Sequence, residues 1–228
     1  MLCKILLILC LVALGACAPS IAARAKKPSR SYADARRELD DRIRLHPEPS
    51  ILFVGNSYSF GVPAALRQMA AEHGKTLRIG HSTHSGWTLA KHSTHEPTLR
   101  KIRNGKWDIV VLQEYSLIPA KPALLRNHAM VPPLRSLAEE ARQAGAIPVL
   151  YQTWGRRDHF RAMNPRVRQG CQAASRAAGN LVIIPVGDAW EREFNAGKGT
   201  ELFMEDGSHP TTAGNRLSAV AFYNALFR

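Results

Sequence analysis

The chain has 228 residues, of which 45% are hydrophobic, so it can bury one sizeable core but does not indicate a second large domain. Lysine and arginine number 31 against 18 aspartate and glutamate residues, which gives a formal net charge of +13. The basic residues are not interleaved with aromatic residues as in nucleic-acid-binding modules, so no nucleic-acid partner is expected. The charge instead indicates contact with anionic lipid or acidic polymer, or simply a basic solvated surface.

The first 16 residues have the layout of a secretory signal peptide. Lys4 precedes an uninterrupted apolar segment over 5–14, which is too short to cross a bilayer comfortably. The stretch 14–17, Leu-Gly-Ala-Cys, resembles a bacterial lipobox, in which the cysteine becomes the lipidated first residue of the mature protein. We therefore expect residues 1–16 to be removed and Cys17 to anchor an exported lipoprotein of the bacterial cell envelope, in the periplasm or at the outer membrane. A plain signal peptide with Cys17 unmodified is the alternative.

The cysteines do not form a disulfide framework. Cys3 and Cys10 lie in the predicted signal peptide and Cys17 is expected to carry lipid, so Cys171 remains alone. A lone thiol cannot form an internal bridge, and the fold must therefore depend on its hydrophobic core. We expect Cys171 to be a half-buried helix residue rather than a nucleophile.

The predicted elements follow a tether. Residues 17–50 are rich in alanine, serine, proline and charge, which predicts a lipid-anchored tether with one short helix over 32–45. The predicted strands are 51–54, 77–79, 109–112, 147–151 and 181–186. The predicted helices are 63–73, 97–104, 123–144 with a break at Pro132-Pro133, 167–178 and 213–227. The strands are almost wholly apolar, so we predict a five-stranded parallel sheet in a three-layer α/β/α sandwich, formed by one domain over 51–228.

Two short motifs lie at the two ends of the predicted domain. Gly55-Asn56-Ser57 ends the first strand and places Ser57 at its carboxyl end, where parallel sheets have their binding crevices. Asp206 and His209 are three residues apart, before the last helix. On one helical turn they would share a face, so the carboxylate would orient the imidazole and the other ring nitrogen would face the Ser57 hydroxyl. Each motif alone could be an ordinary turn or helix cap, but their joint order is typical of a nucleophile and its base, and it indicates a serine hydrolase.

This combination resembles the SGNH (GDSL-like) hydrolases, and the resemblance covers 51–228. The family's first block is commonly Gly-Asp-Ser, whereas Asn56 precedes Ser57 here. Its last block, Asp-x-x-His, is matched without change by Asp206 and His209. The resemblance implies a flavodoxin-like sandwich and an ester hydrolase in which Ser57, His209 and Asp206 are catalytic, with no metal and no organic cofactor.

The same resemblance implies an oxyanion hole. The family's second block supplies a glycine N–H, for which Gly86 is the best match and Gly80 the second. The third block, usually Gly-x-Asn-Asp, lacks its asparagine here. Gln113 carries the same carboxamide on a longer stem, as in SGNH-like subfamilies with Gly-Asn-Ser and a Leu-Gln-Glu segment. The expected donors are therefore the N–H groups of Ser57 and Gly86 and the side chain of Gln113, with Asn56 able to share that role.

The expected substrate is an acylated carbohydrate or another ester. Trp87 and Trp154 follow the second and fourth predicted strands and are expected to stack on sugar rings, while Arg156 and Arg157 could contact an acidic polymer. We therefore expect an exported serine esterase that removes O-acetyl groups from a carbohydrate. The alternatives are a lipid esterase or thioesterase, an acyltransferase, and a non-catalytic envelope binding protein on the same fold. An α/β-hydrolase is disfavoured because Gly-x-Ser-x-Gly is absent.

One short repeat invites a metal-binding interpretation. His81 and His84 are echoed by His92 and His95, and histidines three residues apart can converge on zinc. However, no cysteine or carboxylate second shell accompanies them, and loop histidines are usually only solvated. No metal site is therefore predicted.

Overall fold

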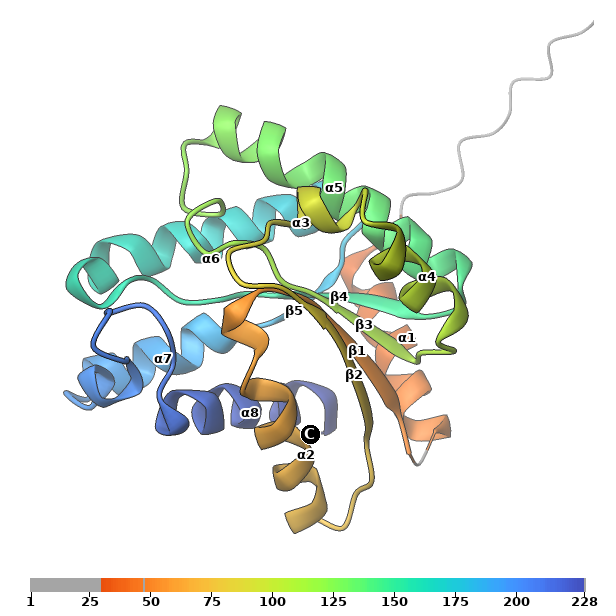
Figure 1. Cartoon of the computed structure of the whole chain (residues 1–228), viewed down its shortest axis with the longest axis horizontal. Helices are drawn as coiled ribbons and strands as arrows, with labels where there is room; N and C mark the ends of the chain where they lie inside the picture. Colours follow the sequence, from red (N-terminus) through yellow and green to blue (C-terminus); the bar gives the residue numbers. More distant parts are fainter. Residues whose placement is uncertain (1–29, 47, 228) are drawn as a thin grey trace, which may run out of the picture.

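The computed structural model of the protein describes residues 30–46 and 48–227. Its centre is a parallel sheet of five strands in the order β2-β1-β3-β4-β5, with helices on both faces (Figure 1). The predicted three-layer sandwich is confirmed. The strands are β1 (Ser50–Gly55), β2 (Arg78–Thr83), β3 (Ile109–Leu112), β4 (Ile147–Tyr151) and β5 (Val182–Ile184). The helices are α1 (Tyr32–Leu45), α2 (Val62–Glu72), α3 (Leu89–His92), α4 (Glu96–Asn104), α5 (Ala123–Gln143), α6 (Phe160–Ala177), α7 (Val186–Asn195) and α8 (Thr212–Phe227).

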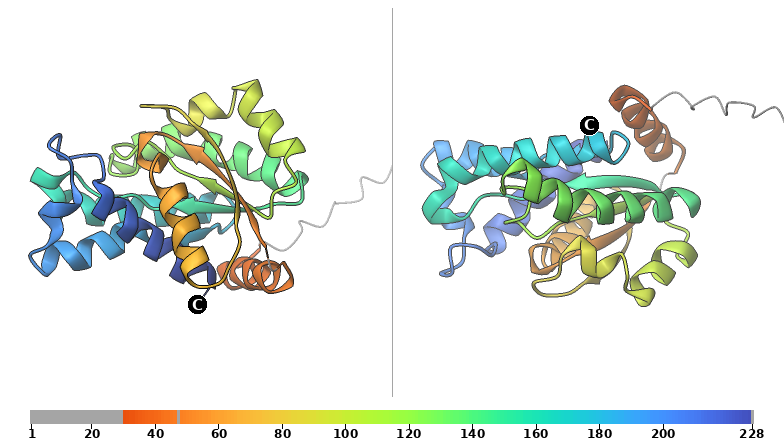
Figure 2. Two further views of the ribbon diagram at one scale, coloured as in Figure 1. Left: turned by 60° about the horizontal axis from the view of Figure 1, so that its bottom comes forward. Right: turned by 90° about the horizontal axis from the view of Figure 1, so that it is seen from above.

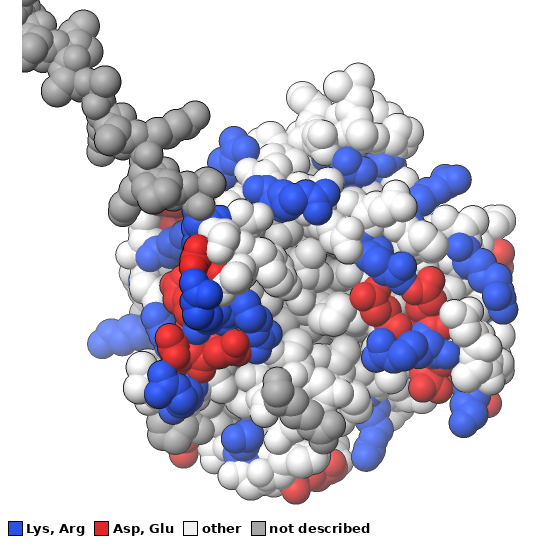
Figure 3. All heavy atoms as spheres, turned by 180° about the vertical axis from the view of Figure 1, so that it is seen from behind, with Lys and Arg blue, Asp and Glu red and all other residues white. Residues whose placement is uncertain are grey.

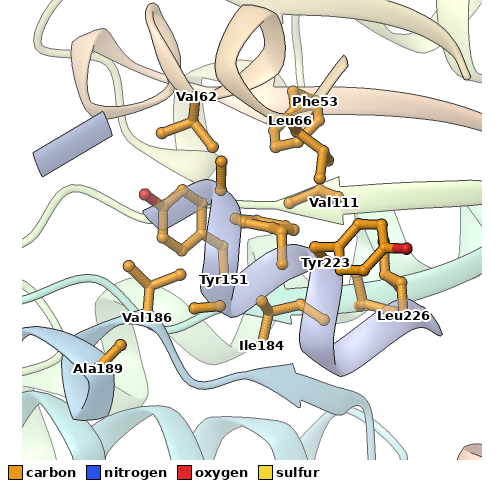
Figure 4. Close-up of a cluster of buried hydrophobic side chains, with 14 of the residues drawn as sticks. Phe53, Val62, Leu66, Val111, Tyr151, Ile184, Val186, Ala189, Tyr223 and Leu226 are labelled. Atoms are coloured by element: carbon orange, nitrogen blue, oxygen red, sulfur yellow. The ribbon is translucent and has the colours of Figure 1, made fainter. Parts of the chain in front are cut away.

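The apolar strands face a core on each side of the sheet. Because successive side chains of a strand point to opposite faces, Ile51 and Phe53 pack with α1, α2, α7 and α8, whereas Leu52 and Val54 pack with α3, α4, α5 and α6. Figure 4 shows part of the first core, where side chains of α2, α7 and α8 meet those of the strands. On the other face, α5 and α6 lie side by side (Figure 2). Burial on both faces explains why the strands lack the alternation of a half-exposed sheet.

The described part of the predicted tether packs on this domain. The expected helix is α1, and it begins with a capping box between Ser31 and Asp34. Ala35 and Leu39 are buried in the core, and the Arg36 guanidinium donates to the carbonyl of Ala225 in α8 at 2.7 Å. The predicted signal peptide and Cys17 lie outside the described residues. No helix in the described part of the chain has the length and apolar character needed to cross a membrane.

The predicted break in the long helix is wrong. Helix α5 continues through Pro132 and Pro133. Two prolines remove backbone hydrogen bonds, a cost of about 3 kcal/mol or more for an interior proline. Met130 and Leu134 on either side are fully buried against the sheet, so packing holds both halves of the helix in line. Helices α3 and α7 were not predicted, because the first is a single turn and the second begins inside the apolar run assigned to the last strand.

Charged side chains are spread over the surface. Figure 3 shows lysines and arginines scattered across one face, with carboxylates gathered in groups among them. Helix α1 carries several such pairs, including Arg36 with Asp40 and Arg44 with Asp41. The positive charge on this face is therefore distributed rather than collected into one stripe.

The sheet register brings three loops to one place. Strand β1 lies between β2 and β3, with Gly55 opposite Thr83 of β2 and Val54 opposite Leu112 of β3. The residues that follow these three strand ends therefore meet at the carboxyl edge of the sheet. Open parallel sheets bind their ligands at this edge.

Candidate active site

Ser57 stands in the turn that follows β1. Asn56 caps a single 3-10 turn over Ser57–Ser59, and its side-chain oxygen accepts the Tyr58 N–H at 3.2 Å. Packing requires a glycine at position 55, before Asn56, because a Cβ on Gly55 would lie 2.5 Å from Oε1 of Gln113. A tight turn with a close neighbour thus fixes the direction of the serine side chain.

The structure brings Ser57, His209 and Asp206 together as the sequence predicts. Ser57 Oγ lies 2.8 Å from His209 Nε2. On the other side of the ring, His209 Nδ1 is hydrogen bonded to Asp206 Oδ2. This is the geometry of a nucleophile, a base and a carboxylate that orients the base.

The loop that carries Asp206 and His209 is not helical, contrary to the prediction. Gly207 has a φ of +64°, a left-handed conformation that an α-helix does not contain. Asp206 Oδ1 accepts the backbone N–H groups of Ser208 and His209, each at 2.9 Å. An Asx-type turn therefore places the two side chains next to each other in place of a helical turn.

Asp206 is ionised at neutral pH. Partial burial pushes its pKa upward, but hydrogen bonds from the His209 ring and from the N–H groups of His209 and Ser208 outweigh burial and lower the pKa to about 2. An ionised carboxylate only accepts hydrogen bonds, so Nδ1 of His209 carries a proton. In the neutral ring Nε2 is then an acceptor facing the Ser57 hydroxyl.

A pocket of about 240 Å³ opens beside Ser57. The residues that line it are Asn56, Ser57, Tyr58, Ser85, Gly86, Tyr115, Arg156, Asp206, Ser208 and His209. Gly86 has a φ of +69°, so this position favours glycine for its backbone rather than for space. Within the described chain, no hydrogen bond occupies the N–H groups of Ser57 and Gly86. Gly80, the second candidate, lies within β2 against Trp107 and does not line the pocket.

Gln113 does not fit the expected role of an oxyanion donor. Its side chain is 0% exposed, and its Nε2 donates to Asn56 Oδ1 at 2.9 Å and to the Glu114 carbonyl at 2.8 Å. Both amide hydrogens are thereby used. Its Oε1 accepts the Asn56 N–H at 2.9 Å and the Ser59 hydroxyl at 3.0 Å. The longer stem thus places the carboxamide behind the site, where it holds Asn56.

Asn56 itself reaches the pocket. Its Nδ2 donates to the carbonyl of Trp87 at 2.9 Å. A carboxamide nitrogen carries two hydrogens, and the described residues provide a partner for one of them, while Asn56 also lines the pocket. The bond to Trp87 also ties the turn after β1 to the loop that holds Gly86.

The two tryptophans predicted to bind sugar have different surroundings. Trp154 is 0% exposed and stacks between Tyr58 and Trp190, at ring-centroid distances of 4.7 and 3.9 Å. It is a core residue below the pocket, so the predicted sugar contact is wrong for Trp154. Trp87 is half-buried, follows Gly86 and stacks on His84 at 4.1 Å.

The repeated histidines form no metal site in the described structure. His92 is fully buried, and its ring nitrogens lie 2.8 Å from the Gly55 carbonyl and 3.2 Å from the Thr98 hydroxyl. Burial lowers the pKa of His92 to about 4, so the ring is neutral and supports the end of β1.

Several residues of the site were missed by the sequence reasoning. The Tyr58 hydroxyl lies 2.7 Å from Ser208 Oγ, which also accepts a hydrogen bond from Arg156. Tyr58 and Ser208 each adjoin a predicted catalytic residue, which is the only signal that could have found them. Glu114 is 2% exposed, and its Oε1 accepts the N–H of Leu89 at 3.2 Å.

No protein-family profile and no curated protein sequence matches the chain. Solved structures do match its fold. TesA is 22% identical, with a TM-score of 0.59 over 78% of this chain and 98% of that chain. A variant of an acetyl xylan esterase from Geobacillus stearothermophilus is 16% identical, with a TM-score of 0.60 over 78% and 94% of the two chains. The psychrotrophic esterase EstA from a Pseudoalteromonas species is 13% identical, with a TM-score of 0.55 over 78% and 97%. The chain thus has the fold of the SGNH (GDSL-like) esterases.

Proposed function

We propose that the protein is a serine esterase with Ser57 as nucleophile, His209 as general base and acid, and Asp206 as the group that orients His209. The observation that carries this proposal is the row of contacts from Asp206 through both nitrogens of His209 to the Ser57 hydroxyl, with 2.8 Å between Oγ and Nε2. A serine hydroxyl becomes a competent nucleophile when such a base takes its proton.

In the acylation step, the Ser57 hydroxyl proton passes to His209 Nε2 as Oγ attacks the ester carbonyl carbon. The carbonyl oxygen becomes an oxyanion, which the N–H groups of Ser57 and Gly86 and the second hydrogen of Asn56 Nδ2 stabilise. His209 then donates the proton to the leaving alcohol oxygen. The acyl group remains on Ser57.

In the deacylation step, His209 takes a proton from water, and the resulting hydroxide attacks the acyl-enzyme. The second oxyanion collapses, Ser57 Oγ leaves as the alkoxide, and His209 returns the proton to it. Asp206 keeps the ring in one tautomer and stabilises its charged form throughout. These steps need neither a metal nor an organic cofactor.

The proposed substrate is an O-acetyl ester on a carbohydrate. The pocket of about 240 Å³ is smaller than the roughly 300–1,000 Å³ that drug-sized ligands fill, which favours a small acyl group. Trp87 stands beside Gly86, where a half-buried ring could contact a sugar. The shared fold with an acetyl xylan esterase supports the same substrate class.

The proposed location is the cell envelope, through the signal peptide and a lipidated Cys17. The sequence of residues 1–17 supports this. Mass measurement of the mature amino terminus tests it. A free Cys17 thiol in the exported protein would contradict the lipoprotein, although not the esterase.

Hydrolysis of p-nitrophenyl acetate tests the proposed chemistry. We expect Ser57→Ala to lower the turnover number by roughly a thousandfold or more. Ser93→Ala, which removes a hydroxyl bonded only to the Ala90 carbonyl, is the matched control and should keep parental activity. A fluorophosphonate should label the parent at Ser57 and leave Ser57→Ala unlabelled. Equal activity of parent and Ser57→Ala would reject the nucleophile.

Two further measurements separate the related functions. A preference for long acyl chains over acetyl would indicate a lipid esterase. Transfer of the acetyl group to a second sugar in place of release as acetate would indicate an acyltransferase. A parent without labelling or hydrolysis would favour a binding protein on the same fold.

A further inference from the structure

Arg156 lines the same pocket as Ser57 and His209. It lies in the loop after β4 and is half-buried. Its guanidinium donates to the Ser208 hydroxyl, and its central carbon lies 5.9 Å from the centroid of the Tyr58 ring. A positively charged group in the pocket of Ser57 affects which esters bind there.

Hydrogen bonds and ring contacts join the residues beneath Arg156. Ser208 Oγ lies 2.7 Å from the hydroxyl of Tyr58, whose ring stacks flat on the buried Trp154. Trp154 in turn donates its indole N–H to the Ser208 carbonyl at 3.1 Å. The guanidinium therefore lies over buried aromatic side chains. Because these contacts already hold it in the free protein, little side-chain entropy is lost when a ligand binds it.

No carboxylate neutralises this arginine among the described residues. The neighbouring Arg157, by contrast, pairs with Asp158 at 3.2 Å. The carboxylate among the pocket residues is Asp206, and its oxygens are occupied by His209 and by the N–H group of Ser208. A guanidinium has five N–H donors, of which the Ser208 bond uses one.

We infer that Arg156 binds a carboxylate carried by the substrate, so that the preferred ester is an O-acetyl group on an acidic sugar such as a uronic acid. This inference rests on the proposed esterase function. Guanidinium groups match carboxylates in shape and bind them through paired N–H donors. The overall positive charge of the protein also favours the approach of an acidic glycan.

The test compares two matched substrates, the O-acetylated methyl glycosides of galacturonic acid and of galactose. We expect the parent to hydrolyse the acidic ester with a kcat/KM about tenfold or more above that for the neutral ester, because hydrogen bonds to charged groups contribute on the order of ten- to a hundredfold in binding. Arg156→Gln should lose this preference, because it should lower kcat/KM for the acidic ester more than for the neutral ester. Arg156→Lys should keep part of the preference.

Arg166→Gln is the matched control, because Arg166 is an exposed residue of α6 outside the pocket and its loss changes the net charge equally. It should keep the preference. Equal kcat/KM values for the two esters in the parent, with hydrolysis still dependent on Ser57, would overturn the inference and leave the esterase in place.

Binding supplies a readout that does not depend on catalysis. The non-acetylated galacturonic acid glycoside should bind the parent and Ser57→Ala alike, with a Kd about tenfold or more below that for Arg156→Gln. Equal Kd values for Ser57→Ala and the double variant that also carries Arg156→Gln would overturn the inference even if no ester is hydrolysed.

Discussion

Gln113 holds Asn56 from two directions at once. Its Oε1 accepts the Asn56 backbone N–H and its Nε2 donates to the Asn56 side-chain oxygen, each at 2.9 Å. The pair is buried at the carboxyl ends of β1 and β3. Asn56 in turn precedes Ser57 and bonds to Trp87, so the Gln113 carboxamide supports both the turn that holds Ser57 and the loop that holds Gly86.

Replacing Gln113 by leucine should therefore lower stability and activity together. It would leave buried polar groups of Asn56 and Ser59 without partners, at about 1–3 kcal/mol each. Urea unfolding and esterase kinetics check this, with the exposed Gln143→Leu as the control. A residue that only donated to the oxyanion would lower kcat and leave the free energy of unfolding unchanged, so that result would contradict the positioning role.

Glu114 should make stability fall as the pH rises. Burial raises its pKa from 4.5 to about 7, despite the hydrogen bonds that its carboxylate accepts from the N–H groups of Tyr115 and Leu89. Its other oxygen is buried without a partner among the described residues. The folded state thus keeps a proton that the unfolded chain releases above 4.5. The protonated Glu114 therefore contributes a few kcal/mol to the free energy of unfolding. This contribution is fully present below pH 4.5 and is lost as the pH rises to about 7.

The variant Glu114→Gln should remove this pH-dependent part of the free energy of unfolding. Its free energy of unfolding should decline less than that of the parent when urea denaturation is repeated at pH 4.5 and pH 8. The exposed Glu72→Gln is the control and should follow the parent. The same decline in parent and Glu114→Gln would show that this carboxyl group does not carry the pH dependence.

Trp154 and Trp87 should respond differently to replacement. Trp154→Ala should lower the free energy of unfolding by about 3–5 kcal/mol, because it removes a fully buried indole between Tyr58 and Trp190. Trp87→Ala should raise the KM for an acetylated sugar with a smaller loss of stability. Thermal unfolding with kinetics on the same samples measures both effects. A raised KM in a fully stable Trp154→Ala would restore the sugar-binding role that its burial excludes.

Cys171 should be unreactive in the native protein. It is a helix residue as predicted, but it is 1% exposed and thus fully buried rather than half-buried, and burial raises the pKa of its thiol to about 12. The thiolate, which is the reactive form, is then scarce at neutral pH. Iodoacetamide should modify the peptide that contains Cys171 only after unfolding, as mass spectrometry can measure. Modification in the native state at the rate of an exposed cysteine would contradict this.

The sequence predicts those features that depend on local patterns. The five strands are apolar throughout because both faces are buried, and this pattern is visible without the structure. Ser57 follows from its place after β1, and Asp206 and His209 follow from their spacing. The spacing holds although the loop is an Asx-type turn rather than a helix, because both conformations bring residues three apart together.

The features that were predicted wrongly depend on side-chain direction and tertiary packing. Gln113 has the right chemical group for the oxyanion, but the length of its stem turns it toward Asn56 and Ser59. Trp154 comes shortly after β4, a position typical of a loop residue at the binding edge. It packs instead against Trp190 in α7, a helix that the sequence pattern did not predict. The prolines of α5 oppose a helix locally and are overruled by burial.

The described chain enters the domain at the other end of the sheet from the pocket. The carbonyl of Arg30, where the described chain begins, accepts a hydrogen bond from Asn180, just ahead of the amino end of β5. Ser57 lies beyond the carboxyl end of β1, and Figure 1 shows α1 and the loops after the strands toward different ends of the sheet. Anything joined to the domain through Arg30 would therefore be attached toward the amino ends of the strands, whereas the pocket lies at their carboxyl ends.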